Sequence, residues 1–174
     1  MPTEFLVHAT GVSALVLNVI ALVRTCERSL RLQSSLAGAV WALNNLLLGA
    51  HTAAALSLVS AGRTASSAAT LRCAAGPRLL AFGGFATLTA TVSLLTWDGW
   101  PSLLVGVASL MSTFAMFYLR GRALRATMIV TSALWMHHAW IHGSWEQILA
   151  NLATALAALY GAWRLDGPDS PARR

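Results

Sequence analysis

A stretch of the first half of this chain returns in the second half with its residues at the same spacing. The matching pairs, each 94 positions apart, are Leu30/Leu124, Arg31/Arg125, Ala39/Ala133, Trp41/Trp135, Gly49/Gly143, Leu58/Leu152 and Ala61/Ala155. A repeat inside an apolar chain indicates two copies of one membrane unit, and such copies commonly meet around a binding site near the bilayer midplane. The repeat therefore restricts the fold more than any other feature does.

The composition places the chain in a membrane. Apolar residues make up 56% of it and charged residues only 10%. Runs such as Phe5–Val23, Leu79–Leu95 and Leu103–Leu119 approach the roughly 20 residues that a helix needs to cross a hydrocarbon core. A water-soluble domain of this size could not bury so many helices that are apolar all round. The sequence predicts an all-α integral membrane protein.

We expect seven transmembrane helices. Their predicted bounds are Phe5–Val23, Gln33–Gly49, Thr52–Leu71, Leu79–Thr96, Pro101–Leu119, Leu124–His142 and Trp145–Trp163. The second and third are rich in small residues, which suit close packing between helices. The expected organisation is one transmembrane domain over residues 1–164, followed by a disordered cytoplasmic tail at 165–174.

The arginines give the orientation. Those that fall between or after the predicted helices lie at alternate loops: Arg24, Arg28, Arg31, Arg72, Arg78, Arg120, Arg122, Arg125, Arg164, Arg173 and Arg174. The other loops hold Glu4, Asp98 and Glu146. Basic loops stay on the cytoplasmic side, so we expect the amino terminus outside and the carboxyl terminus inside. The same rule explains the formal net charge of +6 without a nucleic-acid partner.

The repeat then defines the layout. Helices two and three align with six and seven, and Gly11-Val12 of helix one aligns with Gly106-Val107 of helix five. The predicted arrangement is repeat one at 5–72, a linker helix at 78–97 and repeat two at 101–164. Because the linker crosses the membrane once, the two three-helix repeats run parallel (3+1+3), related by an axis along the membrane normal.

The candidate solute-binding residues follow from the same repeat. Trp41 and Trp135 fall mid-helix, and three positions after each come Asn44 and His138. An aromatic ring beside hydrogen-bonding groups can hold a small polar ligand. Polar groups at membrane depth are costly unless they are partnered. The alternative is that the amides only bond neighbouring helices together.

Two further positions belong to this candidate site. Asn151 in helix seven occupies the position of Ser57 in helix three, and Arg63 is the one arginine inside a predicted span. Arg63 could pair with an anionic ligand or a helix carboxyl end; were helix three to end near Gly62, Arg63 would be a loop charge. Asn18 in helix one could line the binding site or only bond neighbouring helices together.

No catalytic or cofactor motif occurs. His138 and His142 have the spacing of zinc-binding helices, but a zinc site needs further ligands, and His51 and Glu146 are the only candidates. We therefore expect no metal, no cofactor and no enzymatic activity. The spans hold no carboxylate that could couple an ion, apart from Glu146 at a boundary, which favours facilitated movement down a gradient.

Motifs in both halves resemble one bacterial family. They are Arg28 … Leu30-Arg31-x-Gln33, Asn45-x-Leu47-Leu48-Gly49, Arg63-Thr64, Thr113-x-Ala115-Met116-Phe117, Arg125-x-x-Met128, Ser132-x-x-Trp135-x-x-His138 and Gly143-Ser144. In order and spacing they resemble the bacterial inner-membrane YgjV family, which implies a polytopic inner-membrane protein. The layout is more distantly similar to the SWEET and PnuC-type (PQ-loop, MtN3-like) transporters, although the PQ dipeptide and the hinge prolines are missing.

Two functions remain open from the sequence. The first is a small-solute transporter or facilitator with a midplane pocket between parallel repeats. The second is a non-transporting scaffold or accessory protein that packs against a membrane partner. We expect the lipid bilayer and a small polar solute as partners, and allow for a homo-oligomer.

Overall fold

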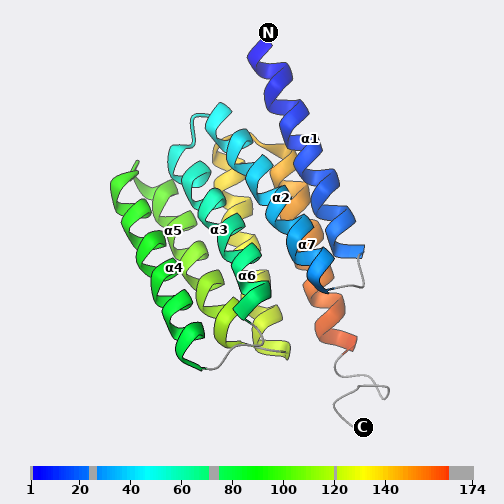
Figure 1. The fold of residues 1–174 in the computed structure, drawn as a ribbon. Coiled ribbons are helices and arrows are strands. Elements are labelled where there is room, and N and C mark those ends of the chain that lie inside the picture. Colours follow the sequence, from blue (N-terminus) through cyan, green and yellow to red (C-terminus); the bar gives the residue numbers. More distant parts are fainter. Residues whose placement is uncertain (1, 24–26, 71–74, 120, 165–174) are drawn as a thin grey trace.

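Seven α-helices account for nearly all of the chain that the structure describes. The computed structural model describes residues 2–23, 27–70, 75–119 and 121–164. The helices are α1 Pro2–Val23, α2 Glu27–Leu47, α3 His51–Thr70, α4 Ala75–Leu95, α5 Trp100–Tyr118, α6 Gly121–Ile141 and α7 Trp145–Arg164. No strand occurs in these ranges. The helices lie side by side, with the start of α1 and the end of α7 at opposite ends of the bundle (Figure 1).

Proline and arginine explain where several helices begin. Pro2, Pro77 and Pro101 all lie in the first turns of their helices, where proline removes no helical hydrogen bond. The predicted starts of α2, α4 and α6 at Gln33, Leu79 and Leu124 were several residues too late. The arginines that the prediction placed in loops are good helix formers, so these helices continue past the apolar run. The predicted end of the third helix at residue 71 and the predicted disordered tail at 165–174 lie outside the described residues.

Three of the described helices are long and apolar enough to cross a membrane. Their windows are Glu4–Ala21 in α1, Ala75–Leu95 in α4 and Trp100–Tyr118 in α5. The four others are 20 or 21 residues long, which is about 30 Å of helix, but they carry more polar side chains. The all-helical fold class is thus confirmed.

Two turns 94 positions apart have the same hydrogen bonds. Between α2 and α3, the Gly49 amide donates to Leu46 (3.1 Å) and the Ala50 amide to Asn45 (2.9 Å). Between α6 and α7, the corresponding amides of 143 and 144 donate to 140 (3.2 Å) and 139 (2.9 Å). This is the Schellman pattern, which needs a left-handed residue after the helix. Gly49 and Gly143 supply it, with φ of 75° and 68°.

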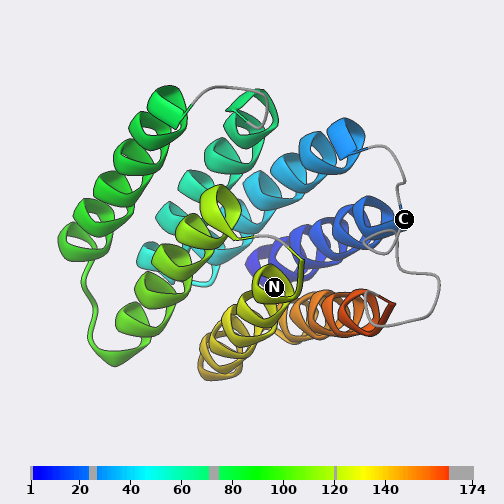
Figure 2. The ribbon, with the colours of Figure 1, turned by 90° about the horizontal axis from the view of Figure 1, so that it is seen from below.

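Six of the helices form a closed ring. Each neighbouring pair packs together in the order α1, α2, α3, α5, α6, α7 and back to α1, while α4 contacts only α3 and α5 among the described residues. Figure 2 views the bundle from below and shows α4 (green) on the outside of this ring. We call α1, α2 and α3 the first triplet and α5, α6 and α7 the second. The triplets therefore meet at two seams, α1–α7 and α3–α5.

Small residues allow α4 to lie close to α5. A Cβ added at Gly106 on α5 would lie 3.0 Å from the Ser93 hydroxyl of α4. Near the other end of the two helices, Phe82 packs edge-on against Phe117 and Tyr118. The exposed residues of α4 include five leucines, Leu79, Leu80, Leu88, Leu94 and Leu95, as suits a helix that touches lipid on one side.

Replacing Gly106 by leucine should therefore separate α4 from α5. We expect Gly106→Leu to lower the stability by about 1–3 kcal/mol, the usual cost of overpacking, measured by thermal unfolding of the purified protein in detergent. Gly84→Leu is the matched control, because nothing lies within 4 Å of a Cβ at Gly84. Equal effects of the two substitutions would contradict this packing.

Candidate functional site

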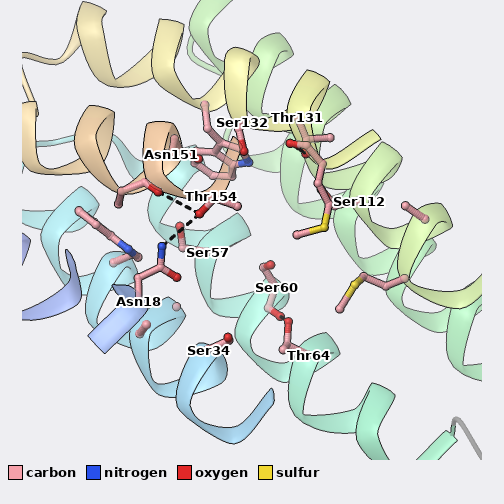
Figure 3. Close-up of a pocket in the computed structure, with 18 of the residues that line it drawn as sticks. Asn18, Ser34, Ser57, Ser60, Thr64, Ser112, Thr131, Ser132, Asn151 and Thr154 are labelled. Atoms are coloured by element: carbon pink, nitrogen blue, oxygen red, sulfur yellow. Dashed lines mark hydrogen bonds between the residues drawn. The ribbon is translucent and has the colours of Figure 1, made fainter. Parts of the chain in front are cut away.

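The six ring helices surround a partly open cavity of about 620 Å³. Each of the six ring helices contributes lining residues, and α4 contributes none among the described residues. Figure 3 shows hydroxyl and amide side chains from α1, α2, α3, α5, α6 and α7 around this space. A volume of this size is typical of a small-molecule site, for which about 300–1,000 Å³ is usual.

Both halves of the sequence repeat supply equivalent lining residues. On α2 and α6 the equivalent lining pairs are Ser34/Met128, Ala37/Thr131, Gly38/Ser132 and Trp41/Trp135. On α3 and α7 they are Ser57/Asn151 and Ser60/Thr154. Every pair is 94 positions apart, the same separation as in the repeated motifs. Six equivalent pairs from the two halves of the repeat therefore contribute to the cavity wall on these four helices.

The cavity reaches from the middle of the bundle towards the end where α5 stops and α6 starts. Met116 lies in the last turn of α5, and Leu124 and Arg125 in the first turns of α6. At the other end Trp135 packs against a cluster of Ala50, Ala53, Leu56 and Val105. Buried apolar side chains thus fill the bundle on the side of Trp135.

Arg63 is buried in the cavity wall. It lies inside α3, which continues to Thr70, and its residue surface is 5% exposed. Its Nη1 donates to the Thr113 hydroxyl (2.7 Å) and the Ser109 carbonyl (3.1 Å), and its Nη2 to the Ser60 hydroxyl (2.8 Å). Its Nε is buried without a hydrogen-bond partner. The guanidinium therefore joins α3 to α5 across one seam.

The other seam is held by shorter side chains. On α1, the Asn18 amide donates to the Thr154 hydroxyl of α7 at 3.2 Å, which Figure 3 shows as a dashed line. Towards the start of both helices, His8 and Glu146 form a contact of 2.6 Å. The α3–α5 seam has a neutral contact at the corresponding level, where the Thr52 and Ser102 hydroxyls are 2.9 Å apart. Each seam is thus held by polar contacts at two levels.

The structure brings four of the six predicted site residues to the cavity. Trp41, Trp135, Asn151 and Arg63 line it. Asn44 and His138 are not among its lining residues.

The Asn44 side chain is fully buried against α1, where its amide donates to the Val7 carbonyl (2.7 Å) and the Thr10 hydroxyl (3.1 Å). His138 is buried on α6 with its ring 4.2 Å from that of His142. Among the described residues no three His, Cys, Asp or Glu side chains come together as a metal site would require.

Sequence reasoning did not select most of the hydroxyl groups in the wall. Ser60, Thr64, Thr131, Ser132 and Thr154 all line the cavity. Serine and threonine are common in packed membrane helices, so they do not stand out singly. Their positions in the repeat could have identified them, since Ser60/Thr154 and Gly38/Ser132 have the same 94-residue offset as Trp41/Trp135.

Helices apolar enough to cross a membrane, packed around a largely apolar cavity with hydroxyl and amide groups in its wall, define a helical membrane protein. The chain belongs to the Imp-YgjV family of bacterial inner membrane proteins, which it matches over residues 5–168. It is similar to the inner membrane protein YgjV of Escherichia coli (strain K12), with 28% identity over 144 residues, covering 83% of this chain and 75% of that protein. No solved structure matches the chain. The family resemblance and the inner-membrane assignment are thereby confirmed.

The position of Asn44 gives a prediction about stability. Asn44→Ala removes both hydrogen bonds to α1 and should lower the stability by about 1 kcal/mol, within the range measured for bonds between membrane helices. Thermal unfolding in detergent measures this effect. Leu43→Ala on the exposed side of α2 is the control and should change the midpoint less. A solute-binding role without a packing role would instead leave the stability of Asn44→Ala unchanged.

Proposed function

We propose that this protein is a transporter or facilitator for a small polar solute in the bacterial inner membrane. The observation that carries the proposal is the cavity whose wall is built from equivalent positions of two halves of the chain. Transporters made from parallel repeats bind their substrates between the repeats, near the bilayer midplane. The YgjV family assignment agrees with the location and leaves the activity open.

The proposed topology has seven membrane crossings in a 3+1+3 arrangement. The two triplets have the same internal packing, since α1–α2 and α2–α3 correspond to α5–α6 and α6–α7. The seams correspond too. In the repeat, α1 is equivalent to α5 and α7 is equivalent to α3, so the α1–α7 seam is equivalent to the α3–α5 seam. A single crossing by α4 makes the triplets parallel, and the arginine distribution places the amino terminus outside.

Movement down a gradient suits this cavity better than ion coupling or catalysis. Neither Asp nor Glu occurs among its described lining residues, and ion-coupled carriers commonly use such a carboxylate. The interiors of α2, α3, α6 and α7 contain no proline, although the SWEET-like architecture uses prolines as hinges. We infer that each triplet would move as a unit about the two seams.

A scaffold that packs against a membrane partner is the second candidate. The burial of Asn44, Asn45 and His138 between helices favours it, because these side chains serve packing in the bundle. The two functions differ in whether water reaches the cavity from both sides of the membrane.

Cysteine accessibility tests this difference without knowledge of the solute. In a background lacking Cys26 and Cys73, we expect Ser132→Cys in the cavity wall to react with a membrane-impermeant maleimide from both faces, in spheroplasts and in inverted vesicles. Thr89→Cys is the control, because Thr89 is buried on α4 away from the cavity and should not react. Reaction from one face only, or from neither, contradicts transport.

Trp135 provides the corresponding test of flux. Trp135→Ala should reduce the flux of transported solutes at least tenfold in proteoliposomes, measured by light scattering against a panel of small polar solutes, because the ring forms part of the cavity wall. Trp140→Ala is the matched control, since Trp140 is on the same helix but 65% exposed and outside the wall. Unchanged flux in folded Trp135→Ala would contradict the assignment of the cavity.

A further inference from the structure

We propose that the cavity binds a small organic anion, whose carboxylate or phosphate group pairs with Arg63. The inference rests on the proposed function for the location of the site, and it adds the chemical class of the solute. It starts from the burial of a permanent positive charge. An arginine inside a membrane protein is expensive and commonly marks a ligand or ion site.

The contacts of Arg63 hold the charge in place without neutralising it. All three hydrogen-bond acceptors, the Ser60 and Thr113 hydroxyls and the Ser109 carbonyl, are uncharged. No ion pair joins Arg63 to any carboxylate of the described residues. A buried charge without an opposite charge is unfavourable, so the site is incomplete without an anion.

The remaining wall favours the same sign of ligand. Arg125 on α6 also lines the cavity, which gives two cationic side chains and no acidic one among its described lining residues. A cleft lined by one sign of charge attracts solutes of the other sign. A cation would meet repulsion here, and a neutral solute would leave Arg63 uncompensated.

Comparison of the two seams shows that packing does not require the arginine. At the α1–α7 seam, Asn18 and Thr154 bond directly. The equivalent residues at the α3–α5 seam are Thr113 and Ser60, and there Arg63 lies between them and bonds both. The residue 94 positions after Arg63 is Ala157, which has no polar group. A scaffold could hold both seams with neutral groups, so the single charge points to a ligand.

The arrangement of donors fits an oxyanion with an organic body. The guanidinium has a buried Nε–H without a partner, and guanidinium groups bind carboxylate and phosphate oxygens through two N–H donors. Trp41 and Trp135 line the same cavity with flat apolar rings. A volume of about 620 Å³ leaves room for a solute larger than an inorganic ion.

The experiment compares charged probes with uncharged counterparts. The full chain, in nanodiscs of phosphatidylcholine, is heated with benzoate or phenyl phosphate, and separately with benzamide or benzyl alcohol. We expect at least one anion, near-saturating at millimolar concentration, to raise the unfolding midpoint by about 3 °C, and its uncharged counterpart to leave it unchanged. Equal responses to charged and uncharged probes, or no response to either anion, overturn the proposal.

Variants assign the effect to Arg63. Arg63→Gln should abolish the anion-specific shift, and Arg63→Lys, which keeps the charge, should retain part of it. Arg122→Gln is the matched control, because it removes one positive charge from an exposed position outside the cavity wall and should keep the full shift. An anion shift that persists in Arg63→Gln overturns the assignment. Should Arg63→Gln fail to fold, the comparison of Arg63→Lys with Arg122→Gln still decides it.

A lipid headgroup could supply the same chemistry. Nanodiscs containing one-third phosphatidylglycerol test this source. Loss of the probe effect there, with a raised unfolding midpoint before the probe is added, would identify a lipid and overturn the proposal for a solute.

Failure of this inference can be distinguished from failure of the proposed transport function. Two-sided labelling of Ser132→Cys without an anion effect would leave a transporter of neutral solutes, whereas an anion effect with one-sided labelling would leave an anion-binding protein.

Discussion

Polar groups inside a bilayer have only the protein itself to bond with, and the arrangement of this chain depends on that constraint. Ser, Thr, Asn and Gln side chains from all six ring helices line the cavity inside the ring. Where two of them meet, amides and hydroxyls bond each other, as Asn18 and Thr154 do.

Local features of the fold were readable from the sequence, and long-range ones were not. Apolar runs predicted all seven helices, because this signal depends on neighbouring residues. Helix starts were less accurate, since arginine near a membrane surface can belong to a loop or to a helix. The closure of α1 on α7 joins residues such as Asn18 and Thr154, and no local pattern specifies their contact.

Helix periodicity predicts which site residues share one face of a helix, but not which neighbouring helix that face contacts. Ser34, Gly38 and Trp41 recur at spacings of four and three and so form one stripe of α2 towards the cavity. Asn44, three residues beyond Trp41, lies about 60° further round the helix. The angle alone does not decide whether Asn44 lines the cavity, because Gly38 is also three residues from Trp41 and lines the cavity. Asn44 lies one turn nearer the end of α2, where its amide donates to α1. The role of Arg63 as a bridge between helices depended on which helix α3 would meet.

The position of α4 makes the two seams differ in how much packing supports them. It packs against both α3 and α5 and so braces that seam from outside, whereas among the described residues no helix covers the α1–α7 seam in the same way. Relative rotation of the triplets would disturb less packing where α1 meets α7. In the proposed transporter, the α1–α7 seam would therefore open more easily than the α3–α5 seam, and its opening would break the contact between His8 and Glu146.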